Sequence, residues 1–304
     1  MAHEQRIGRV EGAPSGRSRR SSRAGRADEP DQPEQPDQAA LDLGIAVPPP
    51  VPTLAAVVAN GGVIDLYAYE AALTAFGRGP IAGADEAGRG ACAGPLVAAA
   101  VILPPDLRPD GLNDSKLMTE LARERAYAVI VGHAEWAVSV IPAAQVDRLG
   151  VQEANYAALR ESVAKLSVRP GTALIDGFAV RGITSGGRPV PAHPVVKGDR
   201  LVACIAAASV VAKVTRDRLM VELDAAYPEY GFAAHKGYAT ADHQERLDRT
   251  GPCPEHRFSY ANVPSARTDP DGGGTMRPEV VQNMKGSARP SQGDLLDAGA
   301  AGAG

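Results

Sequence analysis

The chain has 304 residues, a formal net charge of −4 and 44% hydrophobic residues, which is enough apolar content for one large domain or two small ones. Its three cysteines lie far apart and form no C-x-x-C pair, so a disulfide framework or a zinc site is not expected. No apolar run is long enough for a membrane span or a secretory signal, and we therefore expect a cytoplasmic protein without a membrane partner.

The two ends of the chain differ in composition from the middle. Residues 6–26 hold seven arginines and one acid, and residues 28–37 hold five acids between prolines. Such segments bury too little apolar surface to offset the entropy lost on ordering. We predict a disordered tail over residues 1–60, a folded domain over 61–265 and a second disordered tail over 266–304. The arginine-rich block could contact nucleic acid or be a solvated tail.

Between the tails, hydrophobic periodicity predicts alternating helices and strands. In chain order these are a helix over 63–76, strands over 81–85 and 96–103, a helix over 119–134, a strand over 136–141, one or two helices over 143–166, strands over 172–176 and 193–196, and helices over 201–227 and 239–251. Thr119 and Gly251 are the expected caps of two of these helices. This order predicts an α/β domain with a mixed sheet covered by helices.

Four carboxylates fall at the ends of predicted strands. Asp85 and Glu86 end the first strand, Asp176 ends the fourth and Asp199 follows the fifth. Ligands of open α/β sheets collect at the carboxyl ends of strands, so the four acids converge if the strands are neighbours. Like charges at short range need a cation, and hard oxygen ligands favour Mg²⁺ or Mn²⁺. Taken singly, each acid could instead be a turn or cap residue.

Several segments in the middle of the chain carry a specific ordered pattern. They are GADEAGRGACAGPLVAAAVIL (83–103), GLNDSK (111–116), LIDG (174–177), VVKGD (195–199), AAASVVAKVTRD (206–217), YPEYGFAAHKGYAT (227–240) and HRFSY (256–260). Together they resemble the ribonuclease HII family, the type 2 ribonucleases H, over roughly Leu66 to Val263. The D-E-x-G-R-G pattern in the first segment is the most specific part of the resemblance.

The resemblance implies a ribonuclease H-like α/β fold with a five-stranded mixed sheet flanked by helices and a helical C-terminal part. It implies Asp85, Glu86, Asp176 and Asp199 as the catalytic ligands of Mg²⁺ or Mn²⁺, with two ions in the reacting complex. The implied reaction is endonucleolytic hydrolysis of the RNA strand of RNA–DNA hybrids, including the 5′ side of single ribonucleotides in duplex DNA. Its products carry 5′-phosphate and 3′-hydroxyl ends.

The Gly88-Arg89-Gly90 loop is the expected reader of the ribose. Glycines let the backbone approach a ligand closely, and backbone groups there could hydrogen-bond a 2′-hydroxyl, which distinguishes RNA from DNA. The resemblance adds Tyr238 as the ring that contacts the same sugar. Without the resemblance, the loop could be a simple tight turn and Tyr238 an ordinary half-buried tyrosine.

A polar loop after the second strand is the expected phosphate-binding segment. Asn113, Ser115 and Lys116 suit phosphate contacts, with Lys116 as a point charge, although a solvated loop would look the same. Further positive charge near the predicted groove comes from Lys197, Lys213, Arg216 and Lys236. His235 and His256 are interpreted as structural histidines rather than proton shuttles.

Two classes of function remain open at this stage. The first is the endoribonuclease, with RNA–DNA hybrids and ribonucleotide-containing duplex DNA as partners; the second is a non-catalytic hybrid- or DNA-binding module with the same fold. Four acids facing phosphate repel it without metal, which favours the enzyme. The acidic net charge does not exclude a nucleic-acid partner, because local charge decides binding. Nothing suggests an obligate dimer, so we expect a monomer.

Overall fold

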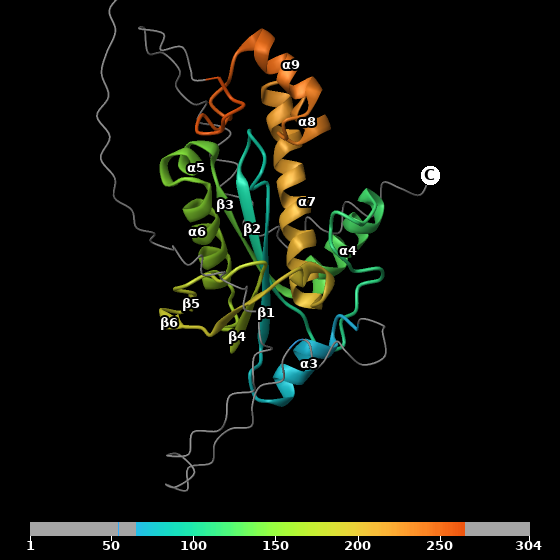
Figure 1. Cartoon of the computed structure of the whole chain (residues 1–304). Coiled ribbons are helices and arrows are strands. Elements are labelled where there is room, and N and C mark those ends of the chain that lie inside the picture. Colours follow the sequence, from blue (N-terminus) through green and yellow to red (C-terminus); the bar gives the residue numbers. More distant parts are fainter. Residues whose placement is uncertain (1–53, 55–64, 265–304) are drawn as a thin grey trace, which may run out of the picture. The chain divides into compact units, whose positions relative to one another are not determined.

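The structure, a computed structural model, describes Leu54 and residues 65–264, in which a five-stranded mixed sheet lies between helices (Figure 1). The strands of this sheet are β1 Ile81–Ala87, β2 Leu96–Ile102, β3 Glu135–Ile141, β4 Thr172–Asp176 and β7 Ala192–Val195. The helices are α3 Ala68–Ala75, α4 Glu120–His133, α5 Ala143–Leu149, α6 Val151–Ala164, α7 Ala203–Ala226, α8 Phe232–His235, α9 Ala241–Thr250 and the 3₁₀ helix η1 Gly198–Arg200. The predicted α/β class and mixed sheet are confirmed.

The sheet has the strand order β3-β2-β1-β4-β7. Neighbours β3, β2 and β1 pair antiparallel, whereas β1, β4 and β7 pair parallel. In the parallel part, Ala84 of β1 lies opposite Ile175 of β4. Asp85 and Asp176 follow these two residues, so the register brings the two carboxylates to the same edge of the sheet.

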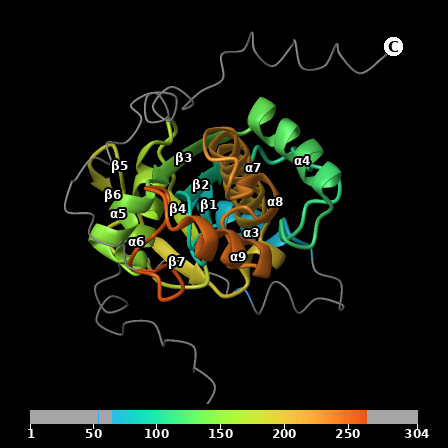
Figure 2. The same ribbon diagram turned by 90° about the horizontal axis from the view of Figure 1, so that it is seen from above.

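Two hydrophobic cores lie on opposite faces of the sheet, one under α7 and α4 and one under α6 (Figure 2). Alternate residues of a strand point to opposite faces, and β2 shows this clearly. Ala99 and Val101 belong to the core under α7, whereas Ala98 and Ala100 belong to the core under α6. Because both faces are covered, β2 is an uninterrupted apolar run. A third core lies in the C-terminal part around Phe232.

Small residues let α7 lie directly against the sheet. The first half of α7 is rich in alanine, and its residues from Ala203 to Ala212 are all buried. At Gly83 of β1, a side-chain carbon would overlap the backbone of Cys204 and Ile205. This close approach brings the amino-terminal end of α7, and η1 just before it, beside the carboxyl end of β1.

Most predicted boundaries are confirmed by specific contacts. Thr119 caps α4 by accepting a hydrogen bond from the backbone N–H of Ala122, and Gly251 ends α9 with a φ of 77°. Residues 143–166 form two helices that meet at Gly150, whose φ is 78°. The first predicted helix is shorter than expected, because α3 begins at Ala68.

The conformation of residues 177–192 was not predicted from the sequence. This segment contains a short hairpin of β5 Thr184–Ser185 and β6 Arg188–Pro189, with positive φ at both Gly186 and Gly187. A Gly-Gly pair is a recognised hairpin signal, but the strands are too short to show an alternating pattern.

The predicted tails over residues 1–60 and 266–304 lie outside the described residues, apart from Leu54. The same holds for the first two residues of the predicted helix over 63–76. Among the residues that the structure describes, no helix is both long and apolar enough to cross a membrane.

Replacing Gly83 with alanine tests the close approach of β1 and α7. Because the added carbon would meet backbone atoms that cannot rotate away, we expect Gly83→Ala to lower the free energy of unfolding by about 3 kcal/mol. Gly132→Ala in α4 is the matched control, since its added carbon meets no atom within 4 Å and alanine favours a helix by about 0.5–1 kcal/mol. Urea denaturation measures both, and equal stability of the two variants would contradict the packing described.

Candidate active site

Three carboxylates meet at one edge of the sheet. Oxygens of Asp85, Asp176 and Asp199 lie within 4.8 Å of one another, as the strand-end pattern predicts. Asp85 shares the face of β1 that carries Ile81, and Asp176 shares the face of β4 that carries Leu174, so both point toward α7. Asp199 arrives from η1. We call these three residues the acidic cluster.

Backbone contacts fix the acidic cluster. Asp176 accepts hydrogen bonds from the backbone N–H groups of Gly198, at 2.7 Å, and Asp199, at 3.4 Å. One carboxylate therefore holds the turn that carries another. Lys197, just before this turn, has a φ of 57°, which is uncommon for a residue with a side chain. The backbone here is bent to bring Asp199 toward the strand ends.

The fourth predicted ligand, Glu86, lies beside the acidic cluster on the opposite face of β1. Its carboxylate is 3.9 Å from the guanidinium of Arg89 and close to Asn155 of α6. Glu86 is not part of the group whose oxygens lie within 4.8 Å. Its assignment as a ligand stays a prediction.

The electrostatics of the acidic cluster fit a bound divalent cation. Burial, followed by the charges of Glu86 and Asp176, raises the pKa of Asp85 well above its usual value. Burial and the charge of Asp176 likewise raise the pKa of Asp199. Carboxylates gathered in this way repel one another, and a hard cation with oxygen ligands is the group that would relieve the repulsion.

Asn155 is a site residue that the sequence analysis missed. It is completely buried in α6 beside Glu86, and its amide lowers the pKa of that carboxylate against the larger opposing effect of burial. No other described group offers the amide a regular hydrogen bond, and a buried amide needs a partner, so Glu86 is the group with which it pairs. The sequence did contain a sign of this role, because Asn155 falls on the apolar face of the helix, between the buried Ala154 and Ala158.

One residue of the predicted phosphate-binding loop, Lys116, contacts the acidic cluster. The Lys116 ammonium lies 3.8 Å from Asp199 and remains largely exposed, so this charge can reach both the cluster and a ligand. Ser115 is buried with its hydroxyl 2.7 Å from that of Ser209, and the Asn113 side chain accepts a hydrogen bond from the next backbone N–H. Their roles in phosphate binding stay predictions.

Asp114 explains the position of this loop, and the sequence analysis missed it. It is buried and accepts hydrogen bonds from the backbone N–H of Lys116 and from the guanidinium of Arg200 in η1. Burial alone would raise its pKa, but these hydrogen bonds outweigh burial and lower it. Asp114 therefore joins the loop to the turn that carries Asp199.

The Gly88-Arg89-Gly90 loop and Tyr238 come together around Arg216. Gly88 has a φ of 84°, and a side-chain carbon there would overlap the Arg216 side chain. On the other side, the Arg216 guanidinium lies 5.4 Å from the centre of the Tyr238 ring, which is partly exposed. The two elements predicted to read the ribose thus contact the same buried arginine.

Arg216 itself corrects one expectation. We expected it to supply positive charge near the predicted groove, but it is completely buried, with its guanidinium donating to the carbonyl oxygens of Pro95, Ala93 and Lys236. Burial lowers its pKa to about 10, so it stays charged at neutral pH. An arginine on a helix is usually solvated. The carbonyl oxygens that accept from Arg216 belong to segments far from it in the sequence, so the helix pattern alone did not reveal its burial.

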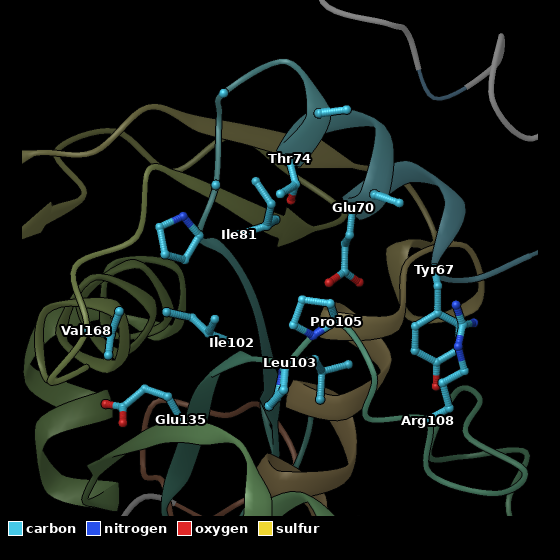
Figure 3. A pocket seen from close by; sticks show the side chains of 16 residues that line it. Tyr67, Glu70, Thr74, Ile81, Ile102, Leu103, Pro105, Arg108, Glu135 and Val168 are labelled. Atoms are coloured by element: carbon cyan, nitrogen blue, oxygen red, sulfur yellow. The ribbon is translucent and has the colours of Figure 1, made fainter.

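The described pocket of about 830 Å³ lies away from the acidic cluster (Figure 3). It is lined by α3, by the start of β1 at Ile81 and by the end of β2 at Ile102, whereas the acidic cluster lies at the other end of β1. Glu70 in its wall accepts a hydrogen bond from the backbone N–H of Cys204. Burial raises the pKa of Glu70 to about 7. This contact caps α7, and the pocket shares no residue with the candidate active site.

Comparison with known proteins agrees with the site. The family model for ribonuclease HII matches residues 82–263, which include every member of the acidic cluster. The chain belongs to the ribonuclease HII family. The ribonuclease HII of Salinispora tropica is 59% identical over 201 residues, covering 65% of this chain and 73% of that protein. The ribonuclease HII of Mycobacterium leprae is 54% identical over 205 residues, covering 67% and 83%.

Solved structures of the ribonuclease H class share the fold. The ribonuclease H2 of Pyrococcus horikoshii superposes with a TM-score of 0.52 at 24% identity, covering 60% of this chain and 94% of that one. A ribonuclease HIII solved in complex with Mn²⁺ gives a TM-score of 0.52 at 23% identity, covering 63% and 71%. The predicted ribonuclease H-like fold is confirmed. As a member of the ribonuclease HII family, the chain is an endoribonuclease that acts on RNA–DNA hybrids.

The raised pKa of Asp85 predicts how the stability of the metal-free protein changes with pH. Above about pH 4 the unfolded state releases the Asp85 proton, whereas the folded state keeps it. The stability that protonated Asp85 gives the folded state is therefore fully present at low pH and is lost as the pH rises. Asp85→Asn removes the titration. In EDTA, we expect the variant to gain stability relative to wild type as the pH rises above about 4, by about 1.4 kcal/mol per unit of pKa shift.

Urea denaturation at several pH values measures this difference, and excess Mg²⁺ should reduce it by stabilising only the wild type. A difference that does not change with pH would contradict the raised pKa of Asp85, which burial and the neighbouring carboxylates cause together.

Proposed function

We propose that this chain hydrolyses the RNA strand of RNA–DNA hybrids and also cuts on the 5′ side of single ribonucleotides in duplex DNA. Water adds to the phosphorus, the bond to the 3′ oxygen breaks, and that oxygen takes a proton. The products carry a 5′-phosphate on the ribonucleotide and a 3′-hydroxyl on the upstream strand. The observation that carries the proposal is the acidic cluster, with three carboxylates within 4.8 Å beside a loop suited to reading ribose.

Asp85, Asp176 and Asp199 are the residues that would hold the divalent ions, with Glu86 as the neighbouring fourth ligand. Two Mg²⁺ or Mn²⁺ ions, when bound, supply the polarisation of the water and of the leaving oxygen. The carboxylates suit either ion, and one structural neighbour was solved with Mn²⁺.

The chain's own residues supply position and charge. The hydrogen bonds from Gly198 and Asp199 to Asp176 keep the ligand set rigid, so little reorganisation accompanies substrate binding. Lys116 is exposed above the acidic cluster and is placed to contact a phosphate oxygen of the substrate. Asp114 keeps this lysine over the carboxylates.

Ribose selection is assigned to the Gly88-Arg89-Gly90 loop and Tyr238. The Arg89 guanidinium donates a hydrogen bond of 2.7 Å to the side-chain oxygen of Gln152 and lies over the Phe178 ring. These contacts fix the loop beside Glu86. Backbone groups of a fixed loop can hydrogen-bond a 2′-hydroxyl that DNA lacks. The partly exposed Tyr238 ring completes the surface.

Cleavage of a DNA duplex with one ribonucleotide tests the reaction. With Mg²⁺ or Mn²⁺ we expect a single cut on the 5′ side of the ribonucleotide, no cut in an all-DNA duplex, and no cut with EDTA. Asp85→Asn should lower kcat by at least about 1000-fold while the far-ultraviolet circular dichroism stays unchanged. Asp217→Asn is a matched control, because Asp217 pairs with Lys213 at 2.7 Å and lies outside the acidic cluster.

Full activity of Asp85→Asn would contradict the ligand assignment. A folded wild-type protein that binds the duplex but never cuts it would favour a non-catalytic binding module.

Tyr238→Ala tests ribose selection separately from the chemistry. If the ring reads the ribose in the reacting complex, the variant should lose roughly 10- to 100-fold in kcat on the single-ribonucleotide duplex. Duplex affinity should change less than threefold, because most of it comes from phosphate contacts. Gel-shift titration and single-turnover cleavage measure the two quantities, and equal losses in both would count against the assigned role.

A further inference from the structure

Two buried histidines lie directly behind Tyr238 in the C-terminal part. His243 of α9 and His256 are both almost completely buried, and their Nε2 atoms are 3.1 Å apart. The rings of Phe232, His235 and Tyr230 pack against the pair at centroid distances of 4.1 to 5.6 Å. A hydrogen bond between two imidazoles requires one ring to donate and the other to accept.

The outer contacts of the pair decide which ring donates. His243 Nδ1 lies 2.9 Å from the backbone carbonyl oxygen of Tyr238, which can only accept, so Nδ1 carries the proton. The other nitrogen of neutral His243 must then accept from His256 Nε2. His256 Nδ1 is left as an acceptor, and the backbone N–H of Cys253 donates to it at 3.0 Å.

With both rings neutral, these contacts form a directed chain of hydrogen bonds. It runs from the Cys253 N–H through His256 and His243 to the Tyr238 carbonyl oxygen, and the Cys253 sulfur lies 3.2 Å from His256 Nδ1 beside it. While His256 Nε2 carries a proton, a further proton on His243 would set two N–H groups against each other. Burial, followed by the charge of His243, lowers the pKa of His256 to about 4, and burial lowers the pKa of His243, so both rings stay neutral at neutral pH.

The chain of hydrogen bonds connects the two ribose-reading elements. At one end, His243 holds the backbone of Tyr238. At the other end, His256 forms a β-bridge with Ala93, just after the Gly88-Arg89-Gly90 loop, and the next residue, Arg257, donates its side chain to the carbonyl oxygens of Gly94 and Arg89.

We propose that His243 and His256 form a relay of fixed tautomers that positions Tyr238 against the Gly88-Arg89-Gly90 loop. Both are then positioning residues for ribose selection, a role that rests on the proposed function of Tyr238. The relay makes no contact with the acidic cluster through any hydrogen bond among the described residues. Its loss should therefore impair ribose selection and leave ion binding intact.

Nitrogen NMR of the full-length chain tests the relay without reference to activity. With ¹⁵N-labelled histidine, two-bond ¹H–¹⁵N correlations distinguish the two neutral tautomers among the six histidines of the chain. We expect His243 to be an Nδ1–H ring, assigned by the loss of its signals in His243→Gln, and His256 to be an Nε2–H ring, assigned by the loss of its signals in His256→Gln. The same tautomer at both positions, or rapid averaging, would overturn the relay.

Two substitutions at His243 separate positioning from simple packing. Asparagine can place its amide N–H near the Nδ1 position and keep the hydrogen bond to Tyr238, whereas glutamine reaches toward His256. In His243→Gln the Tyr238 carbonyl oxygen keeps only the backbone N–H of Thr240, at 2.8 Å, and loses the bond that ties it to α9. On the single-ribonucleotide duplex we expect His243→Gln to lower kcat about tenfold with KM unchanged, and His243→Asn to lose less than about threefold. Equal losses in the two variants would overturn the positioning role.

A double-mutant cycle shows whether His243 acts through Tyr238. In a Tyr238→Ala background the ring is already absent, so His243→Gln should lower kcat by no more than about twofold further. A second full tenfold loss would mean that His243 acts elsewhere and would overturn the proposal. Failure of the proposed function looks different: the wild type would then cut no ribonucleotide-containing duplex, and the NMR result would still decide the relay.

Discussion

Mutual repulsion among the carboxylates of the acidic cluster is the constraint around which the rest of the site is arranged. Oxygens of Asp85, Asp176 and Asp199 lie within 4.8 Å of one another, and without a cation the repulsion would push them apart. The fold prevents this movement because the strand register fixes Asp85 and Asp176, and the Gly198 turn fixes Asp199. The close packing of α7 on Gly83 then keeps that turn at the sheet.

Buried positive charge on the other side of the site is held in a different way. Arg216 and Arg257 are completely buried, and the hydrogen bonds of both guanidinium groups go mainly to backbone carbonyl oxygens. A buried charge is tolerated when all its donors are satisfied, so each arginine ties several loops to one point. Rigid loops of this kind suit the proposed detection of a single hydroxyl group.

The sequence was sufficient for the sheet and for the convergence of Asp85, Asp176 and Asp199, because strand ends and apolar runs are local patterns. It was insufficient where a side chain meets a remote segment. Asn155 resembles any polar residue of a helix until Glu86 lies beside it, and Arg216 resembles a surface arginine until three carbonyl oxygens surround it. The hydrogen bond between His243 and His256 depends on how the chain turns after α9, which no periodicity reports.

On the proposed assignments, catalysis and ribose selection depend on different parts of this fold. The acidic cluster is built on β1, β4 and η1, whereas the ribose-reading elements are tied to the C-terminal segments after α7. Arg216 is the meeting point, because it contacts Gly88 just after Glu86 and also lies against Tyr238. If these assignments hold, a substitution in the C-terminal part changes which sugar is accepted and leaves cation binding by the carboxylates unchanged. In this arrangement the carboxylates would hydrolyse any phosphodiester placed on them, and the separate C-terminal surface would decide whether RNA or DNA is placed there.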